Sequence, residues 1–185
     1  MKIMLSKEVK LMLMFFLLVT SCQIKKKTDP EAIVQQWMGR EIKFPSSIIC
    51  SELGKVIPCK SNMDKKYRVL VYTDSSGCIS CKLRLDEWKK FIRETDSSLV
   101  DFIFYFNPKE TDNLPDLFKR ENFRRQVYID LHDEIGHINH FPGQMEYQCF
   151  LLDNHNKVLL IGNPTLSTKV WKLYQKTINE RMDHQ

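Results

Sequence analysis

The sequence has few residues of several kinds, and each shortage excludes a class of protein. Six glycines and seven prolines among 185 residues are too few for a fibrous or low-complexity protein. The longest apolar run, from Leu11 to Val19, is too short to span a membrane, which takes about 20 residues. No segment repeats elsewhere in the chain. What remains is one domain of ordinary size, because 43% of the residues are hydrophobic and can form a full core.

Positive charge is also limited. The formal net charge is +5, and residues 1–21, with three lysines and one glutamate, contribute +2 of it. The remaining +3 is evenly mixed with acidic residues, so it does not form a nucleic-acid-binding surface. We expect no nucleic acid among the partners of this protein.

The first 21 residues have the pattern of a secretory signal. Three lysines precede the apolar run from Leu11 to Val19, and small residues follow it. The ending Val19-Thr20-Ser21-Cys22 resembles the bacterial lipobox, in which the cysteine becomes the lipidated first residue of the mature protein. The resemblance implies a stable membrane anchor at Cys22, because several acyl chains hold a protein where one chain binds only marginally. The alternative is an ordinary signal peptide followed by a chance cysteine.

We therefore expect three segments: a lipoprotein signal peptide (1–21), a tether after the lipidated cysteine (22–30) and one folded domain (31–185). A lipid-anchored protein of the cell envelope, facing the periplasm, lies outside the reducing cytoplasm. Disulfides persist there, and a reducing dithiol needs a partner that keeps it reduced.

The strongest functional signal is a Cys-x-x-Cys pair, Cys78 and Cys81. It follows the strand expected at Lys66 to Thr73, whose centre is continuously apolar as in a buried strand. A helix that begins at the pair places its positive N-terminal end beside the first sulfur, which favours thiolate over thiol. The second sulfur lies about one turn further on, within reach of a disulfide. This spacing predicts a redox-active thiol pair.

The rest of the chain alternates strands and helices. Strands separated by helices pair in parallel and adjacent terminal strands pair antiparallel, so we expect an α/β fold with a mixed sheet. Residues 131–144 are expected to form a loop. The expected elements are a helix at 32–38, a hairpin at 47–59, strands at 66–73, 99–106 and 126–130, helices at 79–93 and 114–121, a hairpin at 147–153 and 157–162, and a helix from Thr168.

The first hairpin contains two of the cysteines. A turn at Gly54-Lys55, with glycine in the first central position of a type II′ turn, places Cys50 opposite Cys59. Cβ atoms are close in such a pair, so a disulfide can cross the strands. Pro58 removes a donor from the ladder and allows the register to slip. A disulfide and two reduced cysteines therefore both remain open.

This order of elements resembles the thioredoxin fold, and more closely the envelope-anchored thioredoxin-like proteins of the TlpA/ResA type. The resemblance covers residues 44–178. The stretches that carry it are Cys78-Ile79-Ser80-Cys81-Lys82, and Phe150-Leu151-Leu152-Asp153 followed by Asn156-Lys157-Val158, which is similar to the family's hairpin.

The resemblance implies a thioredoxin-like mixed sheet flanked by helices, an N-terminal β-hairpin and no cofactor. It also implies that Cys78 is the attacking thiolate and Cys81 the resolving thiol, and that the activity is reduction of disulfides in oxidised envelope proteins. Electrons would come from a membrane electron donor. The residues expected to contact the substrate are Gly77, Ile79, Ser80, Tyr147 and Gln148.

Three residues depart from the family pattern. The buried acid six residues before the first cysteine falls on Tyr72, and the nearest acid is Asp74. Where the family has an aromatic residue, just before the first cysteine, this chain has Gly77. The cis-proline that precedes the last hairpin falls on Tyr147, and Pro142 is the only proline nearby.

Other interpretations of these residues remain. Zinc would need two ligands besides the Cys-x-x-Cys pair, and the other cysteines of the domain are scattered. A metal could instead bind the histidines His132, His137 and His140 if that segment were helical, and with the thiol pair they would make a copper-handling protein. A non-catalytic thioredoxin-like domain that binds a partner is a third alternative. Cys149 is either a small core residue or the partner of Cys78 in a second disulfide.

Overall fold

The computed structural model describes residues 29–60, 64–109 and 112–180. The predicted signal peptide and Cys22 lie outside these residues, as does most of the predicted tether. Among the described helices, none combines the length and the apolar character that a membrane span requires. The chain divides between Ile33 and Val34, and the sheet and the candidate site belong to the part that begins at Val34.

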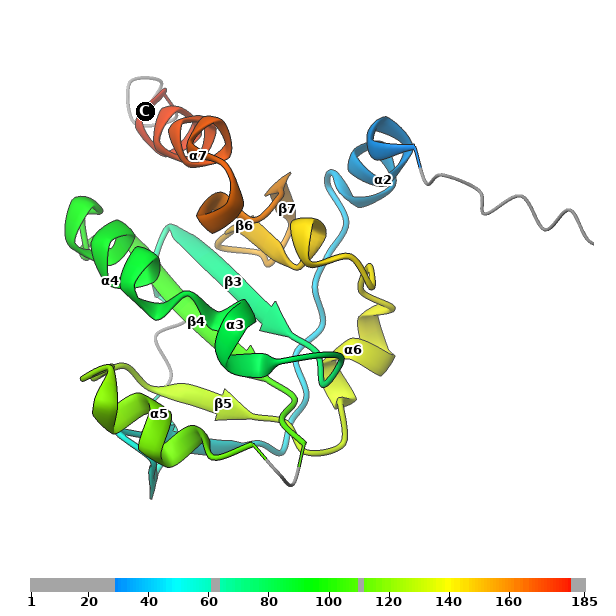
Figure 1. The fold of residues 1–185 in the computed structure, drawn as a ribbon. Helices are drawn as coiled ribbons and strands as arrows, with labels where there is room; N and C mark the ends of the chain where they lie inside the picture. Colours follow the sequence, from blue (N-terminus) through cyan, green and yellow to red (C-terminus); the bar gives the residue numbers. More distant parts are fainter. Residues whose placement is uncertain (1–28, 61–63, 110–111, 181–185) are drawn as a thin grey trace, which may run out of the picture. The chain divides into compact units, whose positions relative to one another are not determined.

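The framework is a seven-stranded mixed sheet with the order β2-β1-β5-β4-β3-β6-β7 (Figure 1). The three central strands β5, β4 and β3 are parallel, and all the other pairs are antiparallel. The expected mixed α/β sheet is thus confirmed. The strands are β1 (Ile49–Glu52), β2 (Lys55–Ile57), β3 (Tyr67–Thr73), β4 (Val100–Phe106), β5 (Val127–Ile129), β6 (Cys149–Asp153) and β7 (Val158–Ile161).

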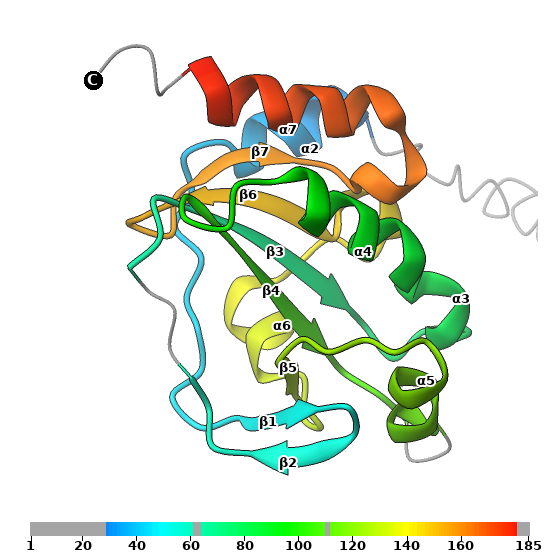
Figure 2. The ribbon, with the colours of Figure 1, turned by 90° about the vertical axis from the view of Figure 1, so that its left-hand side faces the viewer.

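Helices cover the sheet from both sides. Helices α3, α4 and α5 lie on one side and α6 on the other (Figure 1). The side view shows the β1–β2 hairpin at the edge of the sheet opposite β7 (Figure 2). The helices are α2 (Pro30–Trp37), α3 (Ile79–Leu83), α4 (Leu85–Glu94), α5 (Leu114–Arg120), α6 (Glu134–Asn139) and α7 (Thr168–Glu180), with the 3-10 turns η1 (Met145–Tyr147) and η2 (Pro164–Leu166).

Strand β3 is buried along its whole length because both of its faces are covered. Val69 and Val71 belong to the main core together with residues of α4, α5 and α7. Trp88 of α4 stands edge-on to Phe104, with ring centroids 5.8 Å apart, and it is a buried core residue. The rigid centre of the sheet therefore fixes the position of whatever follows the end of β3.

The predicted single helix at 79–93 is wrong, because it is broken at Arg84. Arg84 has left-handed backbone angles (φ 42°, ψ 49°) and separates α3 from α4. Leu83 and Leu85 on either side of it are both buried, whereas residues two apart on a straight helix point in nearly opposite directions. The break lets both leucines reach the core. Cys81, in α3, is exposed.

The predicted turn of the first hairpin is also wrong. Glu52 pairs with Lys55, so the turn residues are Leu53 and Gly54, both with positive φ, as a type I′ turn requires. Cys50 consequently lies opposite Ile57 instead of Cys59.

The cysteines of this hairpin are nevertheless bridged. Strand β2 ends at Ile57, before Pro58, and the chain beyond it brings the Cα atom of Cys59 within 5.2 Å of that of Cys50 in a disulfide. Of the two alternatives that the sequence left open, a disulfide or two reduced cysteines, this structure has the disulfide.

Residues 131–144 are not a continuous loop, because α6 forms within them. The buried carboxylate of Asp130 accepts hydrogen bonds from the backbone N–H groups of Glu134 and Ile135, each at 2.9 Å, at the start of this helix. Ile135 is fully buried and fixes the helix to the sheet. The helix is only six residues long, too short for a periodic apolar pattern to reveal it.

Candidate active site

The thiol pair lies at the C-terminal end of β3, one of the three central strands. Strand β3 ends at Thr73, and the loop Asp74–Gly77 leads directly to Cys78. The neighbouring chain segments are tied to this end: the N–H of Asn107 donates to Thr73 O at 2.9 Å, and the N–H of Tyr72 donates to Gln148 O at 2.9 Å. The loop that carries the pair therefore starts from a fixed point.

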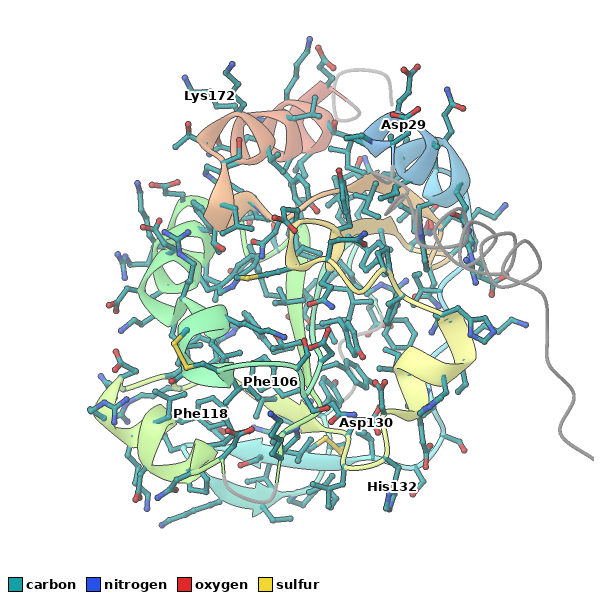
Figure 3. All side chains as sticks on the ribbon, turned by 45° about the vertical axis from the view of Figure 1, so that its right-hand side comes forward. Asp29, Phe106, Phe118, Asp130, His132 and Lys172 are labelled. Carbon is teal, nitrogen blue, oxygen red and sulfur yellow. A yellow bond between two sulfur atoms is a disulfide. The ribbon has the colours of Figure 1, made fainter. Side chains whose placement is uncertain are left out.

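Cys78 and Cys81 are joined in a disulfide, with Cα atoms 5.4 Å apart (Figure 3). Both residues are exposed. Cys78 is the N-cap residue of α3, and its Sγ accepts the N–H of Cys81 at 3.3 Å and lies 3.2 Å from Ser80 Oγ. Donors directed at a sulfur stabilise its thiolate form. Of the two sulfurs, that of Cys78 is therefore the better placed to carry negative charge.

Asp74 binds three segments around the pair. Its carboxylate forms an ion pair with Lys82 of α3, accepts the N–H of Ser76 at 2.8 Å and accepts the side-chain amide of Gln148, which directly precedes β6. The Lys82 and Asp74 side chains are only 15% and 19% exposed. The sequence pointed to Asp74 as the nearest acid, but it gave no sign of the contacts with Lys82 and Gln148.

The contacts of Asp74 decide its charge. Burial raises the pKa of this carboxyl, but hydrogen bonds from Lys82, Ser76 and Gln148 outweigh that effect and lower the pKa to about 2. Asp74 is consequently ionised at neutral pH with its oxygens occupied. It acts as a fixed anion and is not suited to accept a proton.

Tyr72, at the position of the family's buried acid, faces α6. Its hydroxyl donates to Asp133 Oδ1 at 2.6 Å, and its ring centroid is 4.7 Å from that of Phe141. Burial, the hydrogen bond to Asp133 and nearby carboxylates raise the pKa of this phenol. Tyr72 therefore stays protonated and is a structural link between β3 and α6.

The residues expected to contact the substrate differ in exposure. Gly77, with φ +70°, and Ser80 are exposed beside the pair, whereas Ile79 is buried and only 5% exposed. Gln148 is also buried, and besides Asp74 its amide reaches Pro142 O at 3.1 Å. Tyr147 is half-buried at the end of η1. No cis peptide bond occurs in the described chain, so neither position considered for the cis-proline has one.

The histidines do not gather into a metal site. His137 is in α6 and His140 follows it, and the ring Nδ1 of His137 lies 2.7 Å from Asp133 O. Within residues 29–60, 64–109 and 112–180, no three histidine, cysteine or acidic side chains are close enough together to hold a metal ion.

Cys149 is a free thiol on β6 with 1% of its surface exposed. It pairs across the sheet with Val71. Burial raises the pKa of this thiol far above its usual value, which makes the residue inert at neutral pH. This environment agrees with a small core residue.

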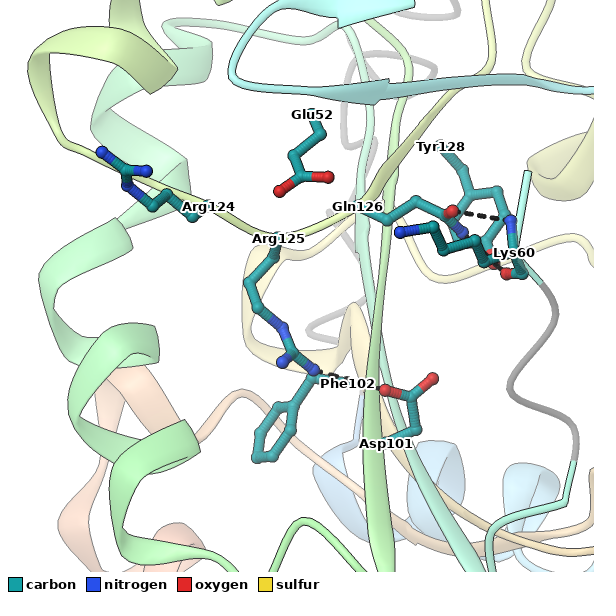
Figure 4. Close-up of a pocket in the computed structure, with 8 residues that line it drawn as sticks. All are labelled: Glu52, Lys60, Asp101, Phe102, Arg124, Arg125, Gln126 and Tyr128. Atoms are coloured by element: carbon teal, nitrogen blue, oxygen red, sulfur yellow. Dashed lines mark hydrogen bonds and ion pairs between the residues drawn. The ribbon is translucent and has the colours of Figure 1, made fainter. Parts of the chain in front are cut away.

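A polar hollow of ≈ 200 Å³ occupies the opposite end of the sheet, at the beginning of β4 and β5 (Figure 4). Arg125 crosses it to pair with Asp101 at 3.3 Å, and the Gln126 side chain bonds both backbone groups of Lys60. These contacts join the end of the first hairpin to β5. They lie far from the thiol pair along the strands and form no part of its site.

No protein-family model and no curated protein matches this chain. Solved structures do match. A protein described as thiol:disulfide interchange protein DsbE from Chlorobium tepidum superposes with a TM-score of 0.56 at 14% identity, covering 76% of this chain and 98% of that one. The thioredoxin domain of a thiol-disulfide oxidoreductase from Bacteroides vulgatus gives 0.54 at 12% identity, with 74% and 97% covered.

A structure described as a protein disulfide isomerase from Bacteroides thetaiotaomicron gives a TM-score of 0.53 at 17% identity, covering 77% of this chain and 88% of that one. At such low identity a likeness shows the fold alone. Together with the mixed seven-stranded sheet and its flanking helices, these matches identify the fold of this chain as thioredoxin-like.

Proposed function

We propose that this protein is a thiol-disulfide oxidoreductase of the cell envelope that reduces protein disulfides through Cys78 and Cys81. The observation that carries the proposal is an exposed Cys-x-x-Cys disulfide at the end of β3, in which one sulfur receives hydrogen bonds that favour its thiolate.

The chemistry is a two-step exchange. The Cys78 thiolate attacks one sulfur of a substrate disulfide and forms a mixed disulfide, and the other substrate sulfur leaves as a thiolate. Cys81 then attacks the Cys78 sulfur, loses its proton, and releases the second substrate thiolate. Two electrons pass to the substrate, and the Cys78–Cys81 disulfide is left for re-reduction.

Location and partners follow from other parts of the chain. The signal pattern and Cys22 support a lipid-anchored protein, and the Cys50–Cys59 disulfide suits a compartment where disulfides persist. In that setting the substrates are oxidised envelope proteins, and a membrane electron donor returns the pair to the dithiol. The reducing direction rests on the resemblance to the TlpA/ResA type.

A redox titration tests the proposal. The purified protein is equilibrated with mixtures of reduced and oxidised glutathione, and the thiols of each peptide are counted by mass. A reversible two-electron step confined to the Cys78–Cys81 peptide is expected, and its midpoint separates a reductant from an oxidant. A pair that stays reduced at every poise, or that binds copper or zinc stoichiometrically, refutes the proposal.

Single-cysteine variants test the roles. Cys81→Ser is expected to accumulate mixed disulfides with protein substrates, because the resolving thiol is missing, and Cys78→Ser is expected to abolish turnover. If Cys78→Ser accumulates the mixed disulfides and Cys81→Ser does not, the two roles are reversed.

A further inference from the structure

A hollow of ≈ 480 Å³ opens beside Cys81, where the α3–α4 junction meets α5. Its wall includes Ser80, Cys81, Arg84 and Leu117, but Cys78 is not part of it. The hollow adjoins the break at Arg84, where the left-handed residue ends one helix and begins the next. Its volume is in the range of pockets that hold small molecules.

The position of the hollow determines which sulfur a bound thiol can reach. A thiolate attacks a disulfide sulfur from the side opposite the leaving sulfur, along the line of the S–S bond. A thiol in the hollow meets Cys81, and the sulfur it expels is that of Cys78. This leaving thiolate is received by the N–H of Cys81 at 3.3 Å and by Ser80 Oγ at 3.2 Å, and a stabilised thiolate leaves faster.

The free charges of the hollow indicate what kind of thiol fits. Of its acidic residues, Asp86 pairs with Lys89 at 2.6 Å, and Glu121 pairs with Arg120 at 3.3 Å. The remaining charged groups of the wall are the guanidinium of Arg84 and the carboxylate of Glu87. Neither has a side-chain hydrogen bond or ion pair with any residue that the structure describes. One unpaired cation and one unpaired anion match a molecule that carries both a carboxylate and an ammonium group.

We propose that this hollow admits a small zwitterionic thiol, of the amino-acid or short-peptide class, that reduces the Cys78–Cys81 disulfide by attacking Cys81. The proposal rests on the proposed function, since it supplies a second route by which electrons reach the pair. The first thiolate forms a mixed disulfide with Cys81 and releases the Cys78 thiolate. A second thiolate attacks the small-molecule sulfur of that mixed disulfide. This attack releases the Cys81 thiolate, and the two small-molecule sulfurs leave joined as a small disulfide. Two thiols thus deliver two electrons and two protons.

Rates of reduction by thiols of different charge test the site. The oxidised full-length protein is mixed with cysteine, 3-mercaptopropionate, cysteamine or 2-mercaptoethanol at equal thiolate concentration, and the loss of the Cys78–Cys81 disulfide is followed by alkylation and mass. The test variant is Arg84→Asn, because asparagine tolerates left-handed backbone. It is expected to lower the rates of reduction by cysteine and mercaptopropionate by about two- to fivefold, the range of an exposed ion pair. The rate of reduction by mercaptoethanol is expected to stay unchanged.

A second variant and a control complete the set. Glu87→Gln is expected to lower the rates of reduction by cysteine and cysteamine but not by mercaptopropionate. The effects of both variants are expected to shrink in concentrated salt. Arg93→Gln removes an exposed arginine of the same helix outside the hollow, so it is expected to change none of the rates. Variants that slow all four thiols equally, or none of them, overturn the proposal.

Lone-cysteine variants test which sulfur the hollow serves. Cystine is added to Cys78→Ser and to Cys81→Ser, and the adduct on the remaining thiol is timed by peptide mass. Adding Arg84→Asn is expected to slow the adduct on Cys81 and to leave that on Cys78 unchanged. The opposite pattern, or equal slowing of both, overturns the proposal.

Reduction of a protein disulfide by the pre-reduced protein, in a single turnover, tests the proposed function separately. If it fails while the charge selectivity is present, the function is refuted and the hollow remains a thiol site.

Discussion

The ion pair between Asp74 and Lys82 is expected to set the charge felt by the Cys78 sulfur. The Lys82 side chain passes Gly77, where an added Cβ would lie 3.9 Å from Lys82 Cε, and Gly77 directly precedes Cys78. The path from Lys82 past Gly77 to Cys78 puts its ammonium on the order of 10 Å from the sulfur, roughly three residue lengths. In the native protein the adjacent Asp74 carboxylate cancels most of this positive charge.

We predict that Asp74→Asn exposes the Cys78 sulfur to an uncompensated cation. At about 10 Å and an effective dielectric constant of about 20 to 40, one unit charge contributes about 1 to 2 kcal/mol, which is about one pH unit in the midpoint of the thiolate titration. The midpoint is expected to fall by that amount in Asp74→Asn. It is expected to rise in Lys82→Met, where the carboxylate remains unpaired, and to return toward the native value in the double variant.

The assay is the ultraviolet absorbance of the thiolate in the reduced protein, recorded against pH, with Cys78→Ser as the blank. The double variant is the control, because it removes both charges and leaves the loop without its ion pair. If both single variants shift the midpoint in the same direction, the ion pair acts only by holding the loop. If neither shifts it, the electrostatic reasoning is refuted.

Three further predictions concern stability and location. Cys59→Ser opens the disulfide that spans nine positions from Cys50, and the loop entropy predicts a loss of about 2–3 kcal/mol in urea unfolding; an unchanged free energy of unfolding would contradict the proposed structural role. Because the pKa of Asp74 is lowered from 3.8 to about 2, its ionised form contributes stability above about pH 4 that is lost as the pH falls toward 2. Urea midpoints across that range are expected to fall less in Asp74→Asn than in the native protein. Cys22→Ala is expected to move the protein from the membrane to the soluble fraction, and unchanged membrane fractionation would rule out the lipid anchor.

The sequence predicts the elements that continuous or periodic burial determines. Strands β3 and β4 were located because a strand buried on both faces is an unbroken apolar run. Helix α7 begins at Thr168 as expected, and its inner positions Trp171, Tyr174 and Ile178 are buried. In such segments, local pattern and tertiary burial agree.

Two local features were missed because the tertiary structure determines them. The left-handed break falls on an arginine, where the usual glycine signal is absent, and it exists because the core takes up the leucines on both sides. In the first hairpin the left-handed residues are Leu53 and Gly54, and the site of Gly54 is enclosed by Pro115 of α5: an added Cβ would lie 2.5 Å from Pro115 Cα. A contact 61 positions away along the chain is not visible in a local turn pattern.

The candidate site divides in the same way. The spacing of the two cysteines is local, so the pair and its place after β3 were predicted from the sequence. The fixed anion beside it depends on Gln148, which lies 74 positions from Asp74 in the chain. The fold brings these two residues together, and no pattern in either segment indicates the contact.

The exposure of Cys81 determines which group can accept the proton of its thiol. In the proposed exchange Cys81 must lose its proton when it resolves a mixed disulfide, and neither Tyr72 nor Asp74 is able to accept it. Tyr72 stays protonated and bonded to Asp133, and Asp74 stays ionised with its oxygens occupied. Because Cys81 is exposed, water or buffer can take the proton directly. In the proposed exchange the resolving step therefore requires no internal relay, and its rate is expected to follow the thiolate fraction of Cys81 that the bulk pH sets, as it does for a thiol in solution.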